Sequence, residues 1–143
     1  RRDYTRVVNG RNPIVAHEYL GDSVEGKTVF IADDIIASGE SMLEVASNLK
    51  ARGAKRIIAD ATFPLFTSGL DKFDKAVEEG TLDYVVGTNL TYRKPELLNR
   101  DWYVDVDVSK YAAYFIVALN HDMSVSSIID PIKKIEALLA SRK

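Results

Sequence analysis

Short apolar runs alternate with stretches of helical periodicity along most of the chain. Apolar residues follow one another at 27–32, 56–61, 82–87 and 102–108, and each run predicts a strand. Apolar residues recur every three or four positions at 41–52, 70–79, 109–120 and from 131 onward, and each of these patterns predicts a helix. Continuous apolar strands are typical of sheets that are covered on both faces. The order of elements predicts an α/β fold with a mainly parallel sheet, flanking helices and right-handed crossovers.

Individual residues mark the ends of several predicted helices. Gly53 follows the helix at 41–52, where a left-handed C-terminal cap is favoured. Asp130 is a suitable N-cap for the last helix, and Pro131 would then occupy the first helical position. The segment 88–100 contains Pro95 and several polar residues, and we predict a loop there.

The chain divides into three predicted regions. Residues 1–27 form a polar lead-in, residues 28–130 form the α/β core, and residues 131–143 form a helical extension. Because the chain opens on two arginines rather than a methionine, we expect it to be cut from a longer polypeptide. The sheet would then be incomplete, because upstream strands are missing, and its open edge would pair with other chains.

Composition narrows the functional classes. The chain has 143 residues, of which 46% are hydrophobic and 28% charged, as expected for one folded domain. A net charge of −2 argues against a broad basic surface for nucleic acid. We find no apolar stretch long enough to cross a membrane and no signal peptide, and we expect a cytoplasmic location. The absence of cysteine excludes disulfides, thiolate metal sites and cysteine nucleophiles.

Residues 28–43 carry the most specific chemistry in the sequence. An apolar run ends in Asp33 and Asp34, then an apolar pair and a small-residue turn precede an amphipathic helix. Ligands of parallel α/β sheets bind beyond the carboxyl ends of the strands, and backbone N–H groups at a helix N-terminus attract anions. Two carboxylates would repel a bare phosphate, but they suit a ligand that also carries hydroxyls or a divalent metal. A phosphorylated sugar combines these features.

Each part of this segment also has a purely structural interpretation. Asp33 and Asp34 could be turn residues at the end of a strand. Ser38 could be an ordinary N-cap, because a serine before an amphipathic helix needs no ligand. The acidic pair and the small-residue turn are joined by three small or apolar residues. This combination indicates a ligand site more specifically than the acidic pair or the turn does alone.

The joined segment resembles the phosphoribosyl-pyrophosphate (PRPP) loop of type I phosphoribosyltransferases. Three further stretches are similar to ribose-phosphate pyrophosphokinases, which are also called PRPP synthetases. The first two residues and Asp3 look like the end of a Lys-Arg-Arg stretch in that family's flexible catalytic loop. Residues 53–64 resemble its next helix–strand–loop unit, and residues 124–127 resemble its serine-rich segment near the C-terminus. The resemblance implies the C-terminal half of such an enzyme, with a phosphoribosyltransferase-like core in residues 28–130 and a remnant of the catalytic loop in residues 1–27.

The resemblance also implies an activity and its residues. The enzyme would transfer the β,γ-diphosphoryl group of ATP to the 1-hydroxyl of ribose 5-phosphate, with Mg²⁺ as cofactor, and would make PRPP for nucleotide biosynthesis. Asp33 and Asp34 would hold the ribose 2- and 3-hydroxyls, and they would also be the candidate ligands for Mg²⁺. Arg2 would be a mobile catalytic cation. Ser124 and Ser126 would belong to a regulatory site that binds a nucleotide phosphate. The residues around the 5-phosphate would be Ala37, Ser38, Gly39, Glu40 and Ser41.

Two departures from the family pattern keep other interpretations open. Ala37 stands where many members carry another acid, and Glu40 replaces a common glycine, so its side chain should point away from the phosphate. A phosphoribosyltransferase that uses PRPP would share the loop, and a regulatory homologue could bind ribose phosphates without turnover. The contacts for ATP are expected upstream, so we expect the chain alone to be inactive and to act as a homo-oligomer or with a companion N-terminal polypeptide.

Overall fold

The computed structural model describes residues 21–141, and these residues form two compact units. The first unit ends at Val106, and the second begins at Asp107.

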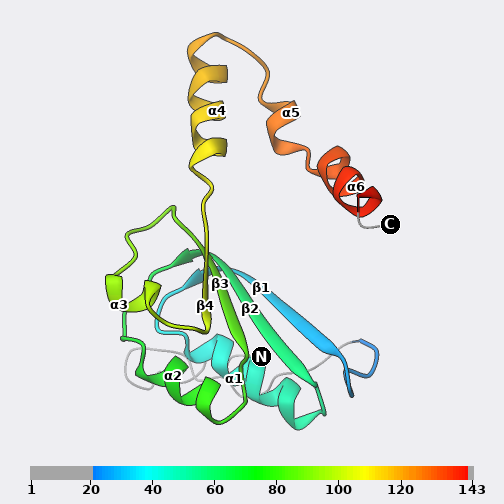
Figure 1. Ribbon diagram of the computed structural model, residues 1–143, viewed down its shortest axis with the longest axis vertical. Helices are drawn as coiled ribbons and strands as arrows, with labels where there is room; N and C mark the ends of the chain where they lie inside the picture. The colour runs from blue at the N-terminus through cyan, green and yellow to red at the C-terminus, as the bar shows by residue number, and fades with distance from the viewer. Residues whose placement is uncertain (1–20, 142–143) are drawn as a thin grey trace, which may run out of the picture. The chain divides into compact units, whose positions relative to one another are not determined.

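The first unit is built on a four-stranded parallel sheet (Figure 1). Its strands lie in the order β1-β2-β3-β4, so each strand pairs with the next one along the chain. This arrangement confirms the predicted α/β fold with a parallel sheet. The strands are β1 (Thr28–Ile36), β2 (Arg56–Pro64), β3 (Tyr84–Thr88) and β4 (Tyr103–Val106).

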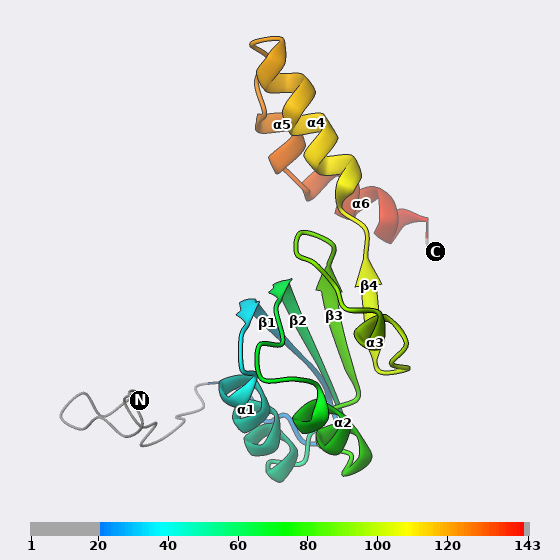
Figure 2. The ribbon, with the colours of Figure 1, turned by 90° about the vertical axis from the view of Figure 1, so that its left-hand side faces the viewer.

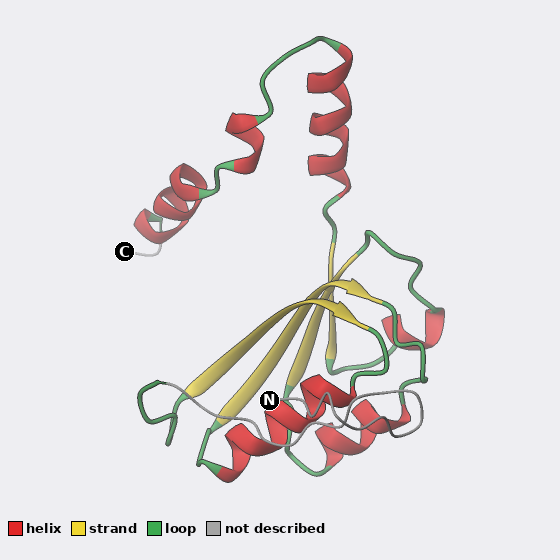
Figure 3. Ribbon diagram, turned by 180° about the vertical axis from the view of Figure 1, so that it is seen from behind, coloured by secondary structure: helices red, strands yellow, loops and turns green. Residues whose placement is uncertain are grey.

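Three helices connect these strands: α1 (Glu40–Ala51), α2 (Asp71–Glu78) and the short α3 (Pro95–Leu98). Figures 2 and 3 show α1 and α2 side by side on one face of the sheet. The core lies between this face and the helices, where Ile57, Phe73 and Val85 have no exposed side-chain surface. Burial of these apolar side chains is the main stabilising contribution to the unit.

The two faces of the sheet differ in burial. Along β2, the buried residues Ile57, Ala59 and Ala61 alternate with half-buried ones, as expected when helices cover one face. The opposite face carries Phe30, which is 60% exposed, and Tyr84, which is 40% exposed. Within residues 21–106, no helix covers this second face.

The second unit contains α4 (Ser109–Asn120), α5 (Ser126–Ile129) and α6 (Ile132–Ala140). The predicted helix at 109–120 coincides with α4. The N-cap of α6 is Pro131 rather than the predicted Asp130, although Asp130 Oδ1 accepts a hydrogen bond from the N–H of Ile132 at 3.0 Å. Large apolar side chains of α4 and α6 are exposed, among them Ile116, Leu119 and Leu138. In the part of the chain that the structure describes, no helix is both long enough and apolar enough to cross a membrane.

Several boundaries differ from the prediction. Strands β1 and β2 extend to Ile36 and Pro64, beyond the apolar runs at 27–32 and 56–61 that predicted them. The predicted loop at 88–100 contains α3, which has Pro95 at its first position, as the fixed φ angle of proline favours. The left-handed cap at Gly53 is confirmed, because its φ is +86° and its N–H donates to Lys50 O at 2.9 Å.

Candidate functional site

The acidic pair lies inside β1 rather than in a loop beyond it. Asp33 pairs in register with Ala61, and the pairing continues through Ile35 and Ile36 to Pro64. The prediction that the strand ends at residue 32 is therefore wrong. Backbone pairing needs only a partner strand, and β2 offers one as far as Pro64, so acidic side chains do not end the strand. The pair nevertheless occupies the carboxyl half of β1, the half nearer the ligand edge of a parallel sheet.

Both carboxylates are exposed. Asp33 Oδ1 accepts a hydrogen bond from the N–H of Asp34 at 2.8 Å. Such a pair has several free oxygen lone pairs for hydroxyl donors or a cation.

Gly39, rather than Ser38, is the N-cap of α1. Its φ is +78°, in the left-handed region that glycine adopts at little cost, and the N–H of Leu43 donates to its carbonyl oxygen at 2.9 Å. The interpretation of Ser38 as an ordinary helix N-cap is therefore wrong. A glycine at the cap leaves the approach to the helix N-terminus without a Cβ, which suits close contact with an anion.

The turn that follows β1 is held from the neighbouring loop. The carbonyl oxygen of Ile36 accepts hydrogen bonds from the N–H groups of Leu65 and Phe66 at 2.9 and 3.1 Å. The carbonyl oxygen of Ala37 accepts a hydrogen bond from the N–H of Thr67 at 2.9 Å. These bonds fix the backbone of the segment 33–41 before any ligand binds, which reduces the entropy lost on binding.

Gly39 also rests on a buried aromatic ring. A Cβ at this position would lie 2.3 Å from Phe73 Cε2 and 2.4 Å from Phe73 Cζ. Phe73 packs edge-on against Phe66 and stacks on Trp102, with ring centroids 4.9 and 5.9 Å apart. This aromatic cluster supports the turn from below, and local sequence patterns do not indicate it because its members are far apart in the chain.

The carboxylate of Glu40 is directed toward α2. Its Oε1 lies 2.7 Å from Nζ of Lys72, and the two side chains are 55% and 50% exposed. Ser41 follows in the first turn of α1 and is exposed, as is Ala37 before the cap. The residues predicted to bind ribose 5-phosphate are consecutive in the chain, and they lie at the end of β1, in the turn and at the start of α1.

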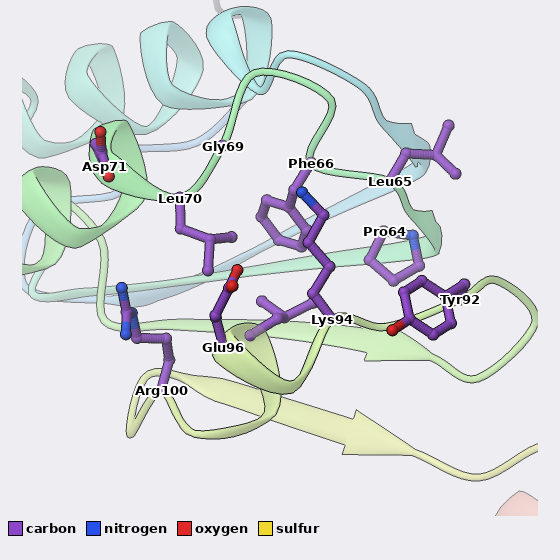
Figure 4. Close-up of a pocket in the computed structure, with 11 residues that line it drawn as sticks. Pro64, Leu65, Phe66, Gly69, Leu70, Asp71, Tyr92, Lys94, Glu96 and Arg100 are labelled. Carbon is purple, nitrogen blue, oxygen red and sulfur yellow. The ribbon is translucent and has the colours of Figure 1, made fainter.

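A cavity of about 340 Å³ is lined by the end of β2, the loop that follows it and the segment between β3 and β4 (Figure 4). Apolar side chains of Phe66, Leu70 and Leu97 line it, together with charged groups. In Figure 4, Tyr92 lies at the end nearer the strand tips and Arg100 at the other end. The loop after β2 lines this cavity, and its N–H groups also donate the hydrogen bonds to the carbonyl oxygens of Ile36 and Ala37. The cavity therefore adjoins the candidate site.

Arg100 is engaged by a carboxylate outside the cavity. Its Nε and one terminal nitrogen donate to Asp74 at 2.9 and 2.8 Å, and Trp102 Nε1 donates to the same carboxylate at 2.8 Å. The hydrogen bond from Arg100 holds the pKa of Asp74 below its usual value, although burial opposes this shift. Local sequence patterns do not indicate this network, because Asp74 lies more than twenty positions before Arg100 and Trp102 in the chain.

The remaining predicted residues lie elsewhere. Arg2 is outside the described residues. Ser124 and Ser126 belong to the second unit, where their hydroxyl oxygens are 3.1 Å apart and the N–H of Ser126 donates to Ser124 Oγ at 3.3 Å. This hydrogen bonding is typical of a serine turn at the start of a short helix.

The side chains of segment 33–41 that could hold Mg²⁺ are those of Asp33 and Asp34. Among residues 21–141, no group of three or more His, Cys, Asp or Glu side chains is placed to hold a metal ion. Asp33 and Asp34 offer only oxygen donors, and both are exposed at the ligand edge. Mg²⁺ is commonly held by one or two carboxylates plus substrate phosphates, so these residues fit an ion that arrives with its substrate.

Fold and site define an α/β protein of the phosphoribosyltransferase type. The structure is similar to a crystal structure of phosphoribosylpyrophosphate synthetase from Mycobacterium smegmatis, with a TM-score of 0.61 and 24% identity. That likeness covers 71% of this chain and 33% of the other, and it supports the fold. Residues 8–130 match the family described as phosphoribosyl synthetase-associated domain, and the chain belongs to this family.

Curated relatives point in the same direction. The chain is 30% identical over 111 residues to a ribose-phosphate pyrophosphokinase of Vibrio cholerae, covering 78% of this chain and 34% of the relative. It is 29% identical over 109 residues to the ribose-phosphate pyrophosphokinase of Shewanella oneidensis, which covers 76% of this chain and 33% of that relative. An orotate phosphoribosyltransferase of Oceanobacillus iheyensis is 41% identical over 64 residues, covering 45% and 30%. The chain thus spans about a third of the length of these relatives.

Proposed function

We propose that the chain supplies the sugar-phosphate site of a ribose-phosphate diphosphokinase. The observation that carries the proposal is segment 33–41, in which two exposed acids precede a glycine-capped helix at the ligand edge of a parallel sheet. The family and the named relatives support it. A cytoplasmic role in nucleotide biosynthesis follows from this activity.

In the proposed complex, the two ends of segment 33–41 bind opposite ends of ribose 5-phosphate. The carboxylates of Asp33 and Asp34 accept hydrogen bonds from the 2- and 3-hydroxyls, and charge-assisted bonds of this kind are strong. Backbone N–H groups and hydroxyls in the turn 37–41, including those of Ser38 and Ser41, bind the 5-phosphate at the N-terminus of α1. Held at both ends, the sugar has its 1-hydroxyl fixed in one orientation for reaction.

The reaction itself needs positioning and charge neutralisation rather than a covalent nucleophile. The 1-hydroxyl oxygen bonds to the β-phosphorus of ATP and loses its proton, while the bond between that phosphorus and the α,β-bridging oxygen breaks. AMP leaves with that oxygen, and the sugar becomes PRPP. Mg²⁺ bound with ATP would neutralise charge on the transferred phosphates, and Asp33 or Asp34 would be its protein ligand. We assign Arg2 the role of a catalytic cation that offsets the charge of the same phosphates.

Two further assignments belong to this proposal. Ser124 and Ser126 would bind a regulatory nucleotide phosphate through their hydroxyl groups. The ATP contacts would come from a homo-oligomeric neighbour or from a companion N-terminal polypeptide, since the described residues offer a sugar-phosphate site without an evident adenine site.

A phosphoribosyltransferase that consumes PRPP is the second candidate, and the 64-residue likeness to an orotate phosphoribosyltransferase favours it. Supplying the full-length protein with ATP, Mg²⁺ and ribose 5-phosphate separates the two activities. We expect AMP to form only when ribose 5-phosphate is present. A separate assay supplies PRPP and orotate. Consumption of PRPP in that assay, together with no formation of AMP in the first one, would favour the second candidate. Binding of ribose 5-phosphate without either reaction would favour a non-catalytic homologue, in line with the departures at Ala37 and Glu40.

A further inference from the structure

Glu40 places a negative charge where the proposed ligand also carries one. It is the first residue of α1, directly after the Gly39 cap, and its carboxylate is favourable for the helix dipole. A 5-phosphate at the same helix N-terminus would be repelled by this carboxylate. A site that binds the anion therefore needs a way to direct or neutralise Glu40.

Two consecutive residues of α2 contact two consecutive residues of the turn. Phe73 lies under Gly39, within 2.4 Å of where a Cβ would be, and Lys72 binds Glu40 with an Nζ–Oε1 distance of 2.7 Å. Phe73 is fully buried, so the position of Lys72 is set by the packing of α2. One helix thus fixes both the backbone and the charge of the turn.

We propose that Lys72 is a positioning residue for the 5-phosphate: it holds the carboxylate of Glu40 toward α2 and offsets its charge. This inference rests on the proposed function of segment 33–41. Both side chains are about half exposed, so the ion pair contributes little to folding stability. Its effect falls on anion binding, because an acid whose charge is less offset remains close to the ligand.

Lys75 provides a matched control on the same helix. It carries the same charge, and its Nζ lies 3.7 Å from Oε1 of Glu79, four residues further along the chain. Removal of Lys75 changes the net charge of the protein as much as removal of Lys72 does, but it leaves the pair with Glu40 intact. A general electrostatic effect would weaken anion binding equally in both variants.

The test measures binding of ribose 5-phosphate to the full-length protein by titration calorimetry, which does not depend on turnover. We expect Lys72→Ala to weaken binding about three- to tenfold at low salt, with a smaller difference at high salt. Lys75→Ala should leave affinity nearly unchanged, and Lys72→Arg should retain it. Adding Glu40→Gln to Lys72→Ala should restore it, since the carboxylate is then gone.

Equal weakening by Lys72→Ala and Lys75→Ala would overturn the inference, and so would a failure of Glu40→Gln to restore binding. Unfolding midpoints of all variants should agree closely, and a large loss of stability in Lys72→Ala would assign the pair a structural role instead. If wild-type protein binds ribose 5-phosphate but releases no AMP, the proposed reaction fails while this inference stands. If wild-type protein does not bind ribose 5-phosphate, both fail.

Discussion

At the residue scale, Gly39 is fixed by two independent requirements. Its φ of +78° is unfavourable for residues with a side chain, and the Phe73 ring occupies the space of a Cβ. A substitution here therefore combines backbone strain with a steric clash. Because Gly39 is also the cap of α1, the same change would displace the turn that we assign to the 5-phosphate.

We predict that Gly39→Ala lowers the free energy of unfolding by about 2–4 kcal/mol, the sum of strain and overpacking. Gly80→Ala is the control, because Gly80 has a φ of +70° but no heavy atom within 4 Å of the added Cβ. It should cost about 1 kcal/mol, from strain alone. Chemical denaturation of both variants measures the difference. Equal losses would show that the contact with Phe73 contributes nothing.

The acids of segment 33–41 could be identified from sequence, but their support could not. Asp33 and Asp34 are neighbours in the chain, so their pattern is visible in a single sequence. The contacts of Gly39 with Phe73 and of Glu40 with Lys72 join residues more than thirty positions apart. Such pairs depend on how α1 and α2 pack together, and local sequence patterns do not encode that packing.

At the element scale, Asp74 links α2 to the chain that enters β4. It accepts hydrogen bonds from Arg100 and from the indole of Trp102, and its pKa lies below the usual value chiefly because of Arg100. A carboxyl group with a lowered pKa in the folded state stabilises that state above the pKa of the unfolded chain. This contribution is lost as the pH falls through the lowered pKa of the folded state.

We predict that Asp74→Asn destabilises the protein at neutral pH and that the difference from wild type shrinks as the pH falls below about 4. Glu78→Gln on the same helix serves as the control, because Glu78 is exposed. Thermal unfolding at a series of pH values provides the measurement. A difference between Asp74→Asn and wild type that does not change with pH would contradict this account.

Element types were easier to predict than element ends. The helix at 109–120 coincides with α4, because its apolar pattern continues from end to end. Strand β1 extends over Asp33 and Asp34, where side-chain hydrophobicity no longer reports backbone pairing. Helix α3 has only four residues, which is too few for helical periodicity to appear, and Pro95, which we predicted to lie in a loop, is its first residue.

At the scale of the whole molecule, much apolar surface of the described residues is exposed. On the face of the sheet opposite α1 and α2, Phe30, Ile58 and Tyr84 form one cross-strand row, and the next row contains Val86 and Val104. Burial in this row raises the pKa of Asp60. Within residues 21–141, strand β1 pairs only with β2, so its other backbone edge has no partner strand among the described residues.

We predict that the 143-residue chain expressed alone self-associates, because exposed apolar faces and open sheet edges favour pairing. Light scattering after size exclusion should give a mass above the 15.9 kDa of one chain. Replacement of Phe30 and Val104 by lysine should reduce the association if the sheet face takes part. A monodisperse species of 15.9 kDa would contradict the prediction.

We propose that segment 33–41 holds ribose 5-phosphate for transfer of a diphosphoryl group. Release of AMP tests this role in the full-length protein supplied with ATP, Mg²⁺ and ribose 5-phosphate, compared with a variant in which Asp33 and Asp34 are both alanine. We predict release that depends on ribose 5-phosphate in the wild type and falls about a hundredfold or more in the variant, because two charge-assisted hydrogen bonds are lost. Release of AMP at the wild-type rate by the double variant would contradict the assignment of this site.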